Sequence, residues 1–346
     1  MKNIYLLVLF AAIIISGCKD DVVPERLQSL PDNHINAIHI DSDGIKYFAT
    51  NKGLASFDGT IWKVIHDNPK ITQGIINDLA FEITDNGPEL WVATFQGVNV
   101  ATLPVDASSG VTTYTEENTA TPFPGQATMK GDSVTIIEVD NKYYRWFGTN
   151  KGLAVFKGNK WPSIQMGNHY PAEFFTINRV TSAASVNDTM YLGTNGGGVA
   201  RFRTNDVDAV TAASPLEIPW SMLPSNNILS VFIDGAIRWF GTDEGLAKHW
   251  GKNAKKGWEQ FYVSDGLLSN RIQCINKDTD GNLWIGTPEG LSVFDGTGWT
   301  GYTVNDGLAG NDVRCIEVDI DGTLWIGTTK GVSHFNGNSW VSYTTE

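Results

Sequence analysis

Histidine and cysteine, on which many metal and catalytic sites depend, are scarce in this sequence. The 346 residues include six scattered histidines and three cysteines. None of the motifs H-E-x-x-H, C-x-x-C or G-x-S-x-G occurs. The sequence therefore predicts no metal centre, no nucleophilic catalytic site and no bound cofactor.

Basic residues are also in short supply. The chain has 25 Lys and Arg against 38 Asp and Glu, which gives a formal net charge of −13. A protein that binds nucleic acid needs basic surface to displace the counterions of the phosphates. The charge balance therefore argues against nucleic acid as a partner.

Helical periodicity is missing as well, since no long stretch repeats apolar residues every 3.6 positions. The apolar run near the N-terminus, Ile4 to Ile15, is too short to span a membrane as a stable helix. Glycine and tryptophan, in contrast, are plentiful, with 36 and 12 residues. Both are expected in a β-sheet array with many turns, whose sheets meet through aromatic layers.

An internal repeat organises most of the chain. The stretch from Asn270 to Tyr302 recurs almost position for position from Asn311, including the tract L-W-I-G-T and the closing W-x-x-Y. The aromatic residue of that tract marks seven copies, which lie 41 to 55 residues apart, the period of four-stranded propeller blades. The seven aromatic residues are Tyr47, Trp91, Trp146, Tyr191, Trp239, Trp284 and Trp325.

Each copy contains the pattern of four short strands. In the last copy, Asp319 to Gly322 supplies turn residues between the first two strands, and Asn336-Gly337 makes the turn before the outer strand. A glycine closes the hairpin between the second and third strands of every copy, as a left-handed bulge residue requires. These glycines are Gly53, Gly97, Gly152, Gly197, Gly245, Gly290 and Gly331.

The pattern predicts an all-β fold: a seven-bladed β-propeller with four antiparallel strands per blade, as one domain over residues 34–346. We expect blades over about 34–65, 75–114, 133–164, 179–218, 227–263, 271–303 and 312–346. Trp284 and Trp325 should be buried between neighbouring sheets. An additional strand from Val22 to Leu30 stays open.

Two features allow more than one interpretation. The Asp-x-Asp-Gly turns, such as Asp278 to Gly281, resemble the opening of a calcium loop, but no Glu stands at its twelfth position; a hairpin stabilised by Asp side chains explains the same spacing. Cys274 and Cys315 occupy the same position in neighbouring copies. They form either a disulfide or two buried thiols.

The N-terminus resembles that of a bacterial lipoprotein. Ile15-Ser16-Gly17-Cys18 is similar to a lipobox, which implies a signal peptide over 1–17, lipid on Cys18 and a tether over 18–33. Lys19-Asp20-Asp21 is similar to the signal that exports lipoproteins of Bacteroidetes-type bacteria to the cell surface. We expect a chain held in the outer membrane only by lipid, on its surface or periplasmic side. An ordinary secretory signal is the alternative.

Three motifs of the repeat, D-x-D-G-x-L-W-I-G-T, G-L-x-x-F-D-G-x-x-W and D-G-L-x-x-N, resemble the two-component regulator propeller repeat. The resemblance covers nearly everything after the tether. It implies the propeller fold, and a role related to the periplasmic sensor half of hybrid histidine kinases. Because this sequence ends at Glu346 without a kinase, the resemblance supports the fold more directly than signalling.

Strand alternation places the crossings between blades at one end of the ring, where we expect the ligand-binding face. The residue after a near-repeated Asn varies there in character, and two long crossings carry aromatic residues and a histidine. The candidate binding residues are His34, Arg179, Asn227, Arg271, Asp312, His169, Tyr170, Phe174 and Phe175.

Two functions are compatible with these patterns. The first is a non-enzymatic binding or sensor-like module for a glycan, a peptide or a protein partner. The second is a propeller enzyme similar to streptogramin lyase, a lyase or hydrolase with His34 or His169 as base and Asp78 or Asp312 assisting. The sequence pairs no base with an orienting group, so binding is the favoured hypothesis and no catalytic residue is assigned.

Overall fold

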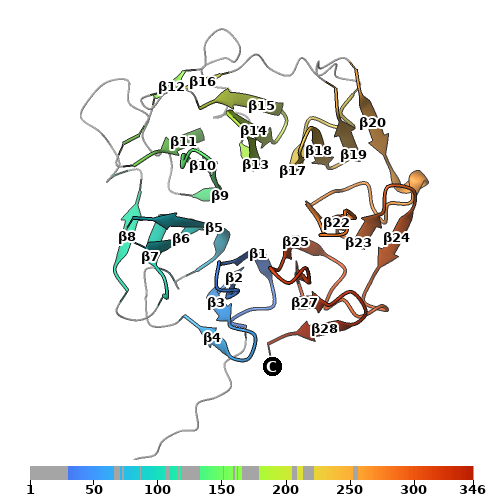
Figure 1. The fold of residues 1–346 in the computed structure, drawn as a ribbon, viewed down its shortest axis with the longest axis horizontal. Helices are drawn as coiled ribbons and strands as arrows, with labels where there is room; N and C mark the ends of the chain where they lie inside the picture. The colour runs from blue at the N-terminus through green and yellow to red at the C-terminus, as the bar shows by residue number, and fades with distance from the viewer. Residues whose placement is uncertain are drawn as a thin grey trace, which may run out of the picture.

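The chain folds into a ring of seven blades, with the first strand of each blade nearest the centre (Figure 1). The computed structural model describes residues 30–65, 71, 74–85, 87–105, 109–115, 117, 133–150, 152–158, 160–161, 163–165, 179–204, 209–212, 222–251 and 256–345. Within these residues, no helix is long and apolar enough to cross a membrane. The predicted fold class is confirmed.

Each blade contributes strands in chain order from the axis outwards. Blades one to three contain β1 (Ile35–Ile40), β2 (Lys46–Thr50), β3 (Gly53–Phe57), β4 (Trp62–Val64), β5 (Ile76–Thr84), β6 (Gly87–Thr94), β7 (Gly97–Thr102), β8 (Val111–Tyr114), β9 (Val134–Val139), β10 (Arg145–Thr149), β11 (Gly152–Phe156) and β12 (Ser163–Gln165). Blades four and five contain β13 (Val180–Val186), β14 (Thr189–Thr194), β15 (Gly198–Arg203), β16 (Ala209–Ala212), β17 (Ile228–Asp234), β18 (Ile237–Thr242), β19 (Leu246–His249) and β20 (Trp258–Phe261). A short 3-10 turn, η1 (Val263–Asp265), leads into blade six. Blades six and seven contain β21 (Cys274–Lys277), β22 (Leu283–Thr287), β23 (Gly290–Phe294), β24 (Trp299–Tyr302), β25 (Val313–Val318), β26 (Leu324–Thr328), β27 (Gly331–Phe335) and β28 (Trp340–Tyr343).

Blades three and four depart from the regular pattern at their outer edge. The strand β12 pairs in parallel with β16 of blade four, with Ile164 opposite Val210, so the two blades share one sheet edge.

The aromatic residues that mark the repeats are the centre of the packing between blades. All seven are at most 4% exposed. The burial predicted for Trp284 and Trp325 is therefore confirmed. A carboxylate at the preceding turn accepts the indole N–H in three blades, from Trp146, Trp284 and Trp325. The acceptors are Asp140, Asp278 and Asp319.

The turns explain why small and acidic residues recur at the same places in the copies of the repeat. In blade one, Asp41 Oδ1 accepts the backbone N–H groups of Asp43 and Ile45, each at 2.9 Å, so the Asp side chain stabilises the hairpin. The second hairpin is fastened by a threonine, as in Thr328 Oγ1 to Gly331 O at 2.9 Å. In blade four the corresponding glycine is Gly198, with φ of 70°, and not the predicted Gly197. The extra residue in that turn shifts the position by one.

The ring closes between blades seven and one without a covalent crossing. Asn33 Oδ1 accepts the N–H of Thr345 at 2.6 Å. The same bond joins Asn311 to Val304 at 2.8 Å where blade six crosses into blade seven. A partly buried ion pair of 2.6 Å from Lys46 to Asp319 adds a second link. Residues 22–29, the predicted source of an additional strand, lie outside the described residues.

Cys274 and Cys315 are free thiols at equivalent positions of β21 and β25. Each lies against a glycine of its own blade, Gly286 and Gly327, where even a Cβ atom would collide with the sulfur. Burial raises the pKa of the Cys274 thiol to about 12. The interpretation as two free thiols therefore fits the structure, with both residues partly buried.

Candidate functional site in the axial cavity

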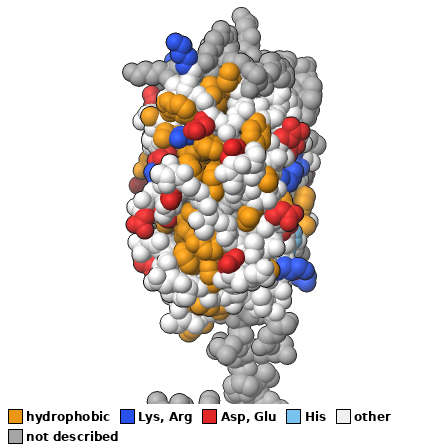
Figure 2. All heavy atoms as spheres, turned by 90° about the vertical axis from the view of Figure 1, so that its right-hand side faces the viewer, with side chains coloured by type: hydrophobic (Ala, Val, Ile, Leu, Met, Phe, Trp, Pro, Cys, Tyr) orange, Lys and Arg blue, Asp and Glu red, His pale blue; other side chains and the backbone are white. Residues whose placement is uncertain are grey.

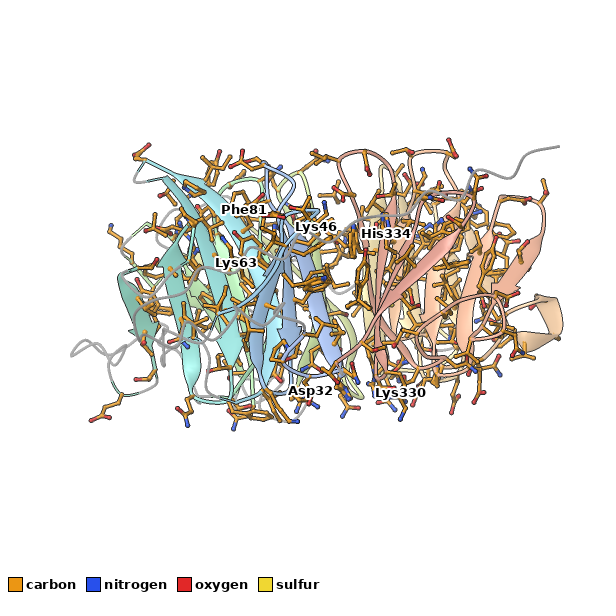
Figure 3. All side chains as sticks on the ribbon, turned by 90° about the horizontal axis from the view of Figure 1, so that it is seen from below. Asp32, Lys46, Lys63, Phe81, Lys330 and His334 are labelled. Carbon is orange, nitrogen blue, oxygen red and sulfur yellow. The ribbon has the colours of Figure 1, made fainter. Side chains whose placement is uncertain are left out.

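The crossings between blades and the hairpins between second and third strands lie at one end of the ring, which we call the crossing face. Asp32 and Lys330 mark it at the lower side of Figure 3, whereas Lys46, Phe81 and His334 lie toward the opposite face. This arrangement follows from four antiparallel strands per blade, as the sequence predicted.

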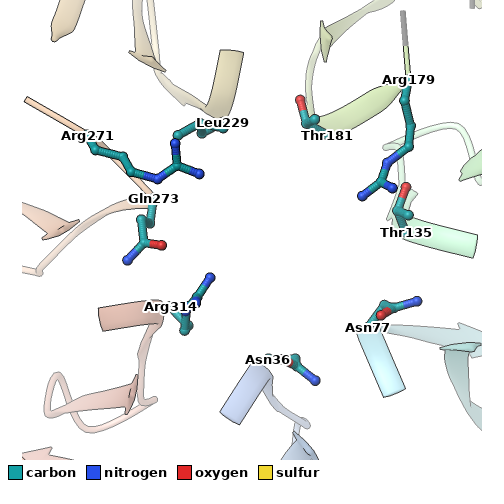
Figure 4. A pocket seen from close by; sticks show the side chains of 9 residues that line it. All are labelled: Asn36, Asn77, Thr135, Arg179, Thr181, Leu229, Arg271, Gln273 and Arg314. Carbon is teal, nitrogen blue, oxygen red and sulfur yellow. The ribbon is translucent and has the colours of Figure 1, made fainter. Parts of the chain in front are cut away.

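A cavity of about 280 Å³ lies on the axis of the ring. Every blade supplies at least one lining side chain. The lining residues are Asn36, Asn77, Thr135, Arg179, Thr181, Leu229, Arg271, Gln273 and Arg314 (Figure 4).

A β-bulge in the first strand places these side chains. In β1, Ile35 pairs with Thr50 and Ala37 with Ala49, which leaves Asn36 as the extra residue. The same shift leaves one extra residue in blades two, three, four, five and seven. An extra residue bends the strand and changes the direction of its side chain. The bulge residues Asn36, Asn77, Thr135, Thr181, Leu229 and Arg314 thereby reach the cavity.

Most of the side chains that line the cavity make hydrogen bonds to the next blade and do not point freely into the open space. Each donates a hydrogen bond to the carbonyl oxygen of the buried residue that begins the following blade. The pairs are Asn36 to Ile76 at 2.8 Å, Asn77 to Val134 at 2.6 Å, Thr135 to Val180 at 3.1 Å, Thr181 to Ile228, and Gln273 to Val313 at 2.8 Å. Leu229 cannot donate such a bond, and Arg314 pairs with Asp312 instead.

Two of the predicted binding residues, Arg179 and Arg271, line the cavity, and both are exposed. Two others lie beside it. Asn227 donates to Asp243 Oδ2 at 2.8 Å. Asp312 accepts from Gln273 at 2.7 Å and from Arg314 at 3.1 Å, which fixes its carboxylate at the rim.

His34 lies near the same rim, within the influence of Arg314, Asp32 and Asp312. Burial, followed by the positive charge of Arg314, lowers its pKa below 6.5. Asp78, which the enzyme hypothesis placed with Asp312, instead accepts the N–H of Ile137 at 2.9 Å between blades two and three. The remaining predicted residues, His169, Tyr170, Phe174, Phe175 and Cys18, lie outside the described residues.

The bulge residues were missed by sequence reasoning. The prediction selected the residue before the first buried Ile or Val of each copy, whereas most of the cavity is lined by the residue after it. A signal was available, because that position is polar in six of the seven copies despite its apolar neighbours. Strict strand alternation does not predict that such a residue turns toward the axis.

Three carboxyl groups lie on the first strands, Asp78 on β5, Glu138 on β9 and Glu317 on β25. Burial raises the pKa of Asp78 to about 7. Burial, and then the negative charge of Asp78, raise the pKa values of Glu138 and Glu317 to about 8. Among the described residues, no group of three or more His, Cys, Asp or Glu is arranged to hold a metal ion.

These carboxyls predict a stability that falls as pH rises from 6.5 to 8. Their folded pKa values exceed the ordinary 3.8 and 4.5, so the folded protein keeps protons that the unfolded chain has lost. Desolvation lowers the pKa of His39 to about 4, so His39 acts in the opposite sense below pH 6.5. We expect a lower Tm at pH 8 than at pH 6.5, and a smaller difference in Glu138→Gln and Glu317→Gln. If both variants showed the same difference in Tm between pH 6.5 and pH 8 as the wild-type protein, the raised pKa values of Glu138 and Glu317 would be contradicted.

Comparison with known proteins agrees with the propeller fold. Residues 266–289 and 307–330 match the two component regulator propeller family. Two blades of the chain are therefore similar to the repeat of that family. Both matched stretches run from the crossing before a first strand to the hairpin after a second strand, in blades six and seven. No curated protein matches the sequence.

Solved structures share the fold of this repeat protein. The extracellular domain of a protein assigned to a hybrid two-component system of B. thetaiotaomicron is 22% identical, with a TM-score of 0.68; the alignment covers 90% of this chain and 41% of that chain. PorZ, a surface component of the type-IX secretion system of Porphyromonas gingivalis, is 15% identical over 88% of this chain and 46% of PorZ, with a TM-score of 0.66. Virginiamycin B lyase from Staphylococcus aureus is 14% identical over 92% of this chain and 99% of the lyase, with a TM-score of 0.59. The repeat protein therefore spans less than half of the first two chains.

Proposed function

We propose that this repeat protein is a sensor-like binding module of the bacterial cell envelope, which recognises a glycan, a peptide or a protein partner without chemical turnover. The observation that carries the proposal is the axial cavity, to which all seven blades contribute side chains. Small-molecule sites are concave and use a few convergent polar groups. The similarity to an extracellular domain of a two-component system supports the same class of function.

The proposed location rests on the N-terminal sequence. Cys18 follows a short apolar run and two small residues, as in a lipoprotein, and residues 19–33 are long enough to hold the ring away from the membrane. We expect Cys18→Ser to move the protein from the membrane fraction to the soluble fraction. A variant that stays in the membrane fraction would rule out lipid on Cys18 as the anchor.

The binding face is tested by changing arginines at opposite ends of the ring. A glycan array with the full-length protein identifies a saccharide ligand, and peptide arrays cover the alternative. We expect Arg179→Ala and Arg271→Ala to weaken binding at least tenfold without lowering the Tm. Arg203→Ala is the matched control, because Arg203 is exposed at the end of β15 that faces away from the crossings. If only Arg203→Ala weakened binding, the crossing face would be the wrong choice.

Catalysis is the second candidate, because His34 lies near Asp312 with a lowered pKa and is therefore neutral at pH 7. A general base is normally oriented by a hydrogen bond from its ring to a second group. Within the described part of the chain, the His34 ring makes no such bond; its backbone N–H donates to Asp32 at 2.7 Å. This difference favours binding over turnover.

A further inference from the structure

The charge of the axial cavity is opposite to that of the whole chain. The protein has a formal net charge of −13, and acidic side chains are spread over the outer wall seen in Figure 2. The cavity, in contrast, is lined by three arginines and by no carboxylate. The guanidinium groups of Arg179, Arg271 and Arg314 enter from three sides and point toward the open centre (Figure 4).

The three arginines differ in how far the protein neutralises them. Arg314 pairs with Asp312 at 3.1 Å, with both side chains about one third exposed. Arg271 interacts electrostatically with Asp243. The carboxylate of Asp243 also accepts a hydrogen bond from Asn227 at 2.8 Å. Among the residues that the structure describes, Arg179 has no ion-pair partner. Arg179 therefore brings to the cavity a positive charge that no carboxylate of the described residues neutralises.

Two amide side chains of the cavity wall, Asn36 and Gln273, have both N–H groups engaged. Asn36 Nδ2 donates both to Asn51 Oδ1 at 3.0 Å and to Ile76 O at 2.8 Å. Gln273 Nε2 donates both to Asp312 Oδ1 at 2.7 Å and to Val313 O at 2.8 Å. An amide has two N–H groups, so neither side chain has a donor left for a ligand. The guanidinium groups are the main donors that remain.

A guanidinium group presents N–H donors in a planar fork that matches a carboxylate, sulfate or phosphate. The cavity volume of about 280 Å³ is near the lower end of the range for small-molecule sites. A ligand of one or two sugar or amino-acid units is of the right size. The exposed acidic residues elsewhere on the protein would repel an anion from other surfaces and favour this mouth.

We infer that the axial cavity binds the carboxylate or sulfate group of a small ligand, with Arg179 and Arg271 as the principal anion-binding residues and Arg314 in support. This inference rests on the proposed binding function and adds the chemical class of the ligand. The group can belong to an acidic sugar or to the end of a peptide, which present the same chemistry to an arginine.

The test is calorimetric titration of the full-length protein with four probes: glucuronate, glucose 6-sulfate, N-acetylalanine and neutral glucose. We expect at least one anionic probe to bind ten or more times more tightly than glucose, and to bind more weakly as salt is added. Tight binding of glucuronate or glucose 6-sulfate would indicate that the natural ligand is an acidic saccharide. Tight binding of N-acetylalanine would indicate the end of a peptide. No measurable binding of any anionic probe would overturn the inference.

Variants then locate the site. The loss of one hydrogen-bonded guanidinium should weaken binding of the anionic probe about tenfold to hundredfold. Arg179→Ala and Arg271→Ala should show this loss, Arg179→Lys a part of it, and Arg203→Ala none. If glucose and glucuronate bind equally and both lose affinity in Arg179→Ala, the anion inference is wrong while the proposed function stands. If neither cavity variant changes binding, the proposed site itself is wrong.

Discussion

Trp325→Ala is expected to lower the free energy of unfolding by about 3 to 5 kcal/mol, because it empties a large buried site. The indole is 2% exposed and donates to Asp319 Oδ2 at 3.1 Å. It packs edge-on against Phe48 and Phe57 of blade one, each with ring centroids 5.7 Å away. Its loss therefore weakens the junction of blades seven and one, where no chain crossing holds the ring closed. Chemical denaturation followed by tryptophan fluorescence and by circular dichroism measures the effect.

Trp250→Ala is the matched control for this experiment. Trp250 directly follows β19 and is 48% exposed, so its removal leaves little cavity. We expect a change within about 1 kcal/mol, which is typical of surface substitutions. If both variants lost the same free energy of unfolding, the position of Trp325 at the junction of blades seven and one would not explain its effect. An unchanged unfolding free energy in Trp325→Ala would contradict the burial itself.

Arg145→Met is expected to lower the free energy of unfolding by about 3 to 5 kcal/mol, because it leaves the buried carboxylate of Glu82 without its partner. Arg145 Nε donates to Glu82 Oε2 at 2.7 Å, and Nη2 lies 2.6 Å from the same oxygen. Both side chains are less than one tenth exposed, and the guanidinium lies 5.0 Å from the centre of the Trp91 ring. This pair joins blades two and three. Since burial already raises the pKa of Glu82, the unpaired carboxyl should take up a proton, and the loss should be smaller at pH 5 than at pH 8.

Two further variants separate the charge effect from the packing effect. The double variant Glu82→Leu with Arg145→Met replaces the ion pair by apolar groups and should recover most of the lost stability. Asp188→Asn removes the pair with Lys142 that joins blades three and four, in which the Asp188 side chain is 59% exposed. We expect that change to cost less than about 1 kcal/mol. A double variant as unstable as Arg145→Met would assign the loss to packing around the guanidinium.

Most of the fold could be predicted from the sequence because each blade is a local unit. Turn residues, strand length and the aromatic residue of each copy depend on neighbours within about 35 residues, and they recur seven times. The parallel pairing of β12 with β16 was not predictable in this way. It depends on how two neighbouring blades meet at the rim, which local pattern does not specify.

The candidate site was predicted only in part. The crossing face follows from strand count alone, and Arg179 and Arg271 were identified as residues on it. Asn36 and Arg314 were not identified, because a β-bulge changes which side chains face the axis and binary patterning assumes strict alternation.

The sequence by itself determined the number of blades, their strand order and the burial of the repeated aromatic residues, since hydrophobic pattern and turn chemistry act over short distances. Only the tertiary structure decided which side chains meet at the axis. Closing the ring brings at least one residue from each of seven distant segments to a common cavity. Asn36, Asn77, Thr135, Thr181 and Gln273 are then held by bonds to the next blade, while the three arginines face the open space. That division depends on contacts between segments about 40 to 60 residues apart, and the order of residues within one repeat does not contain it.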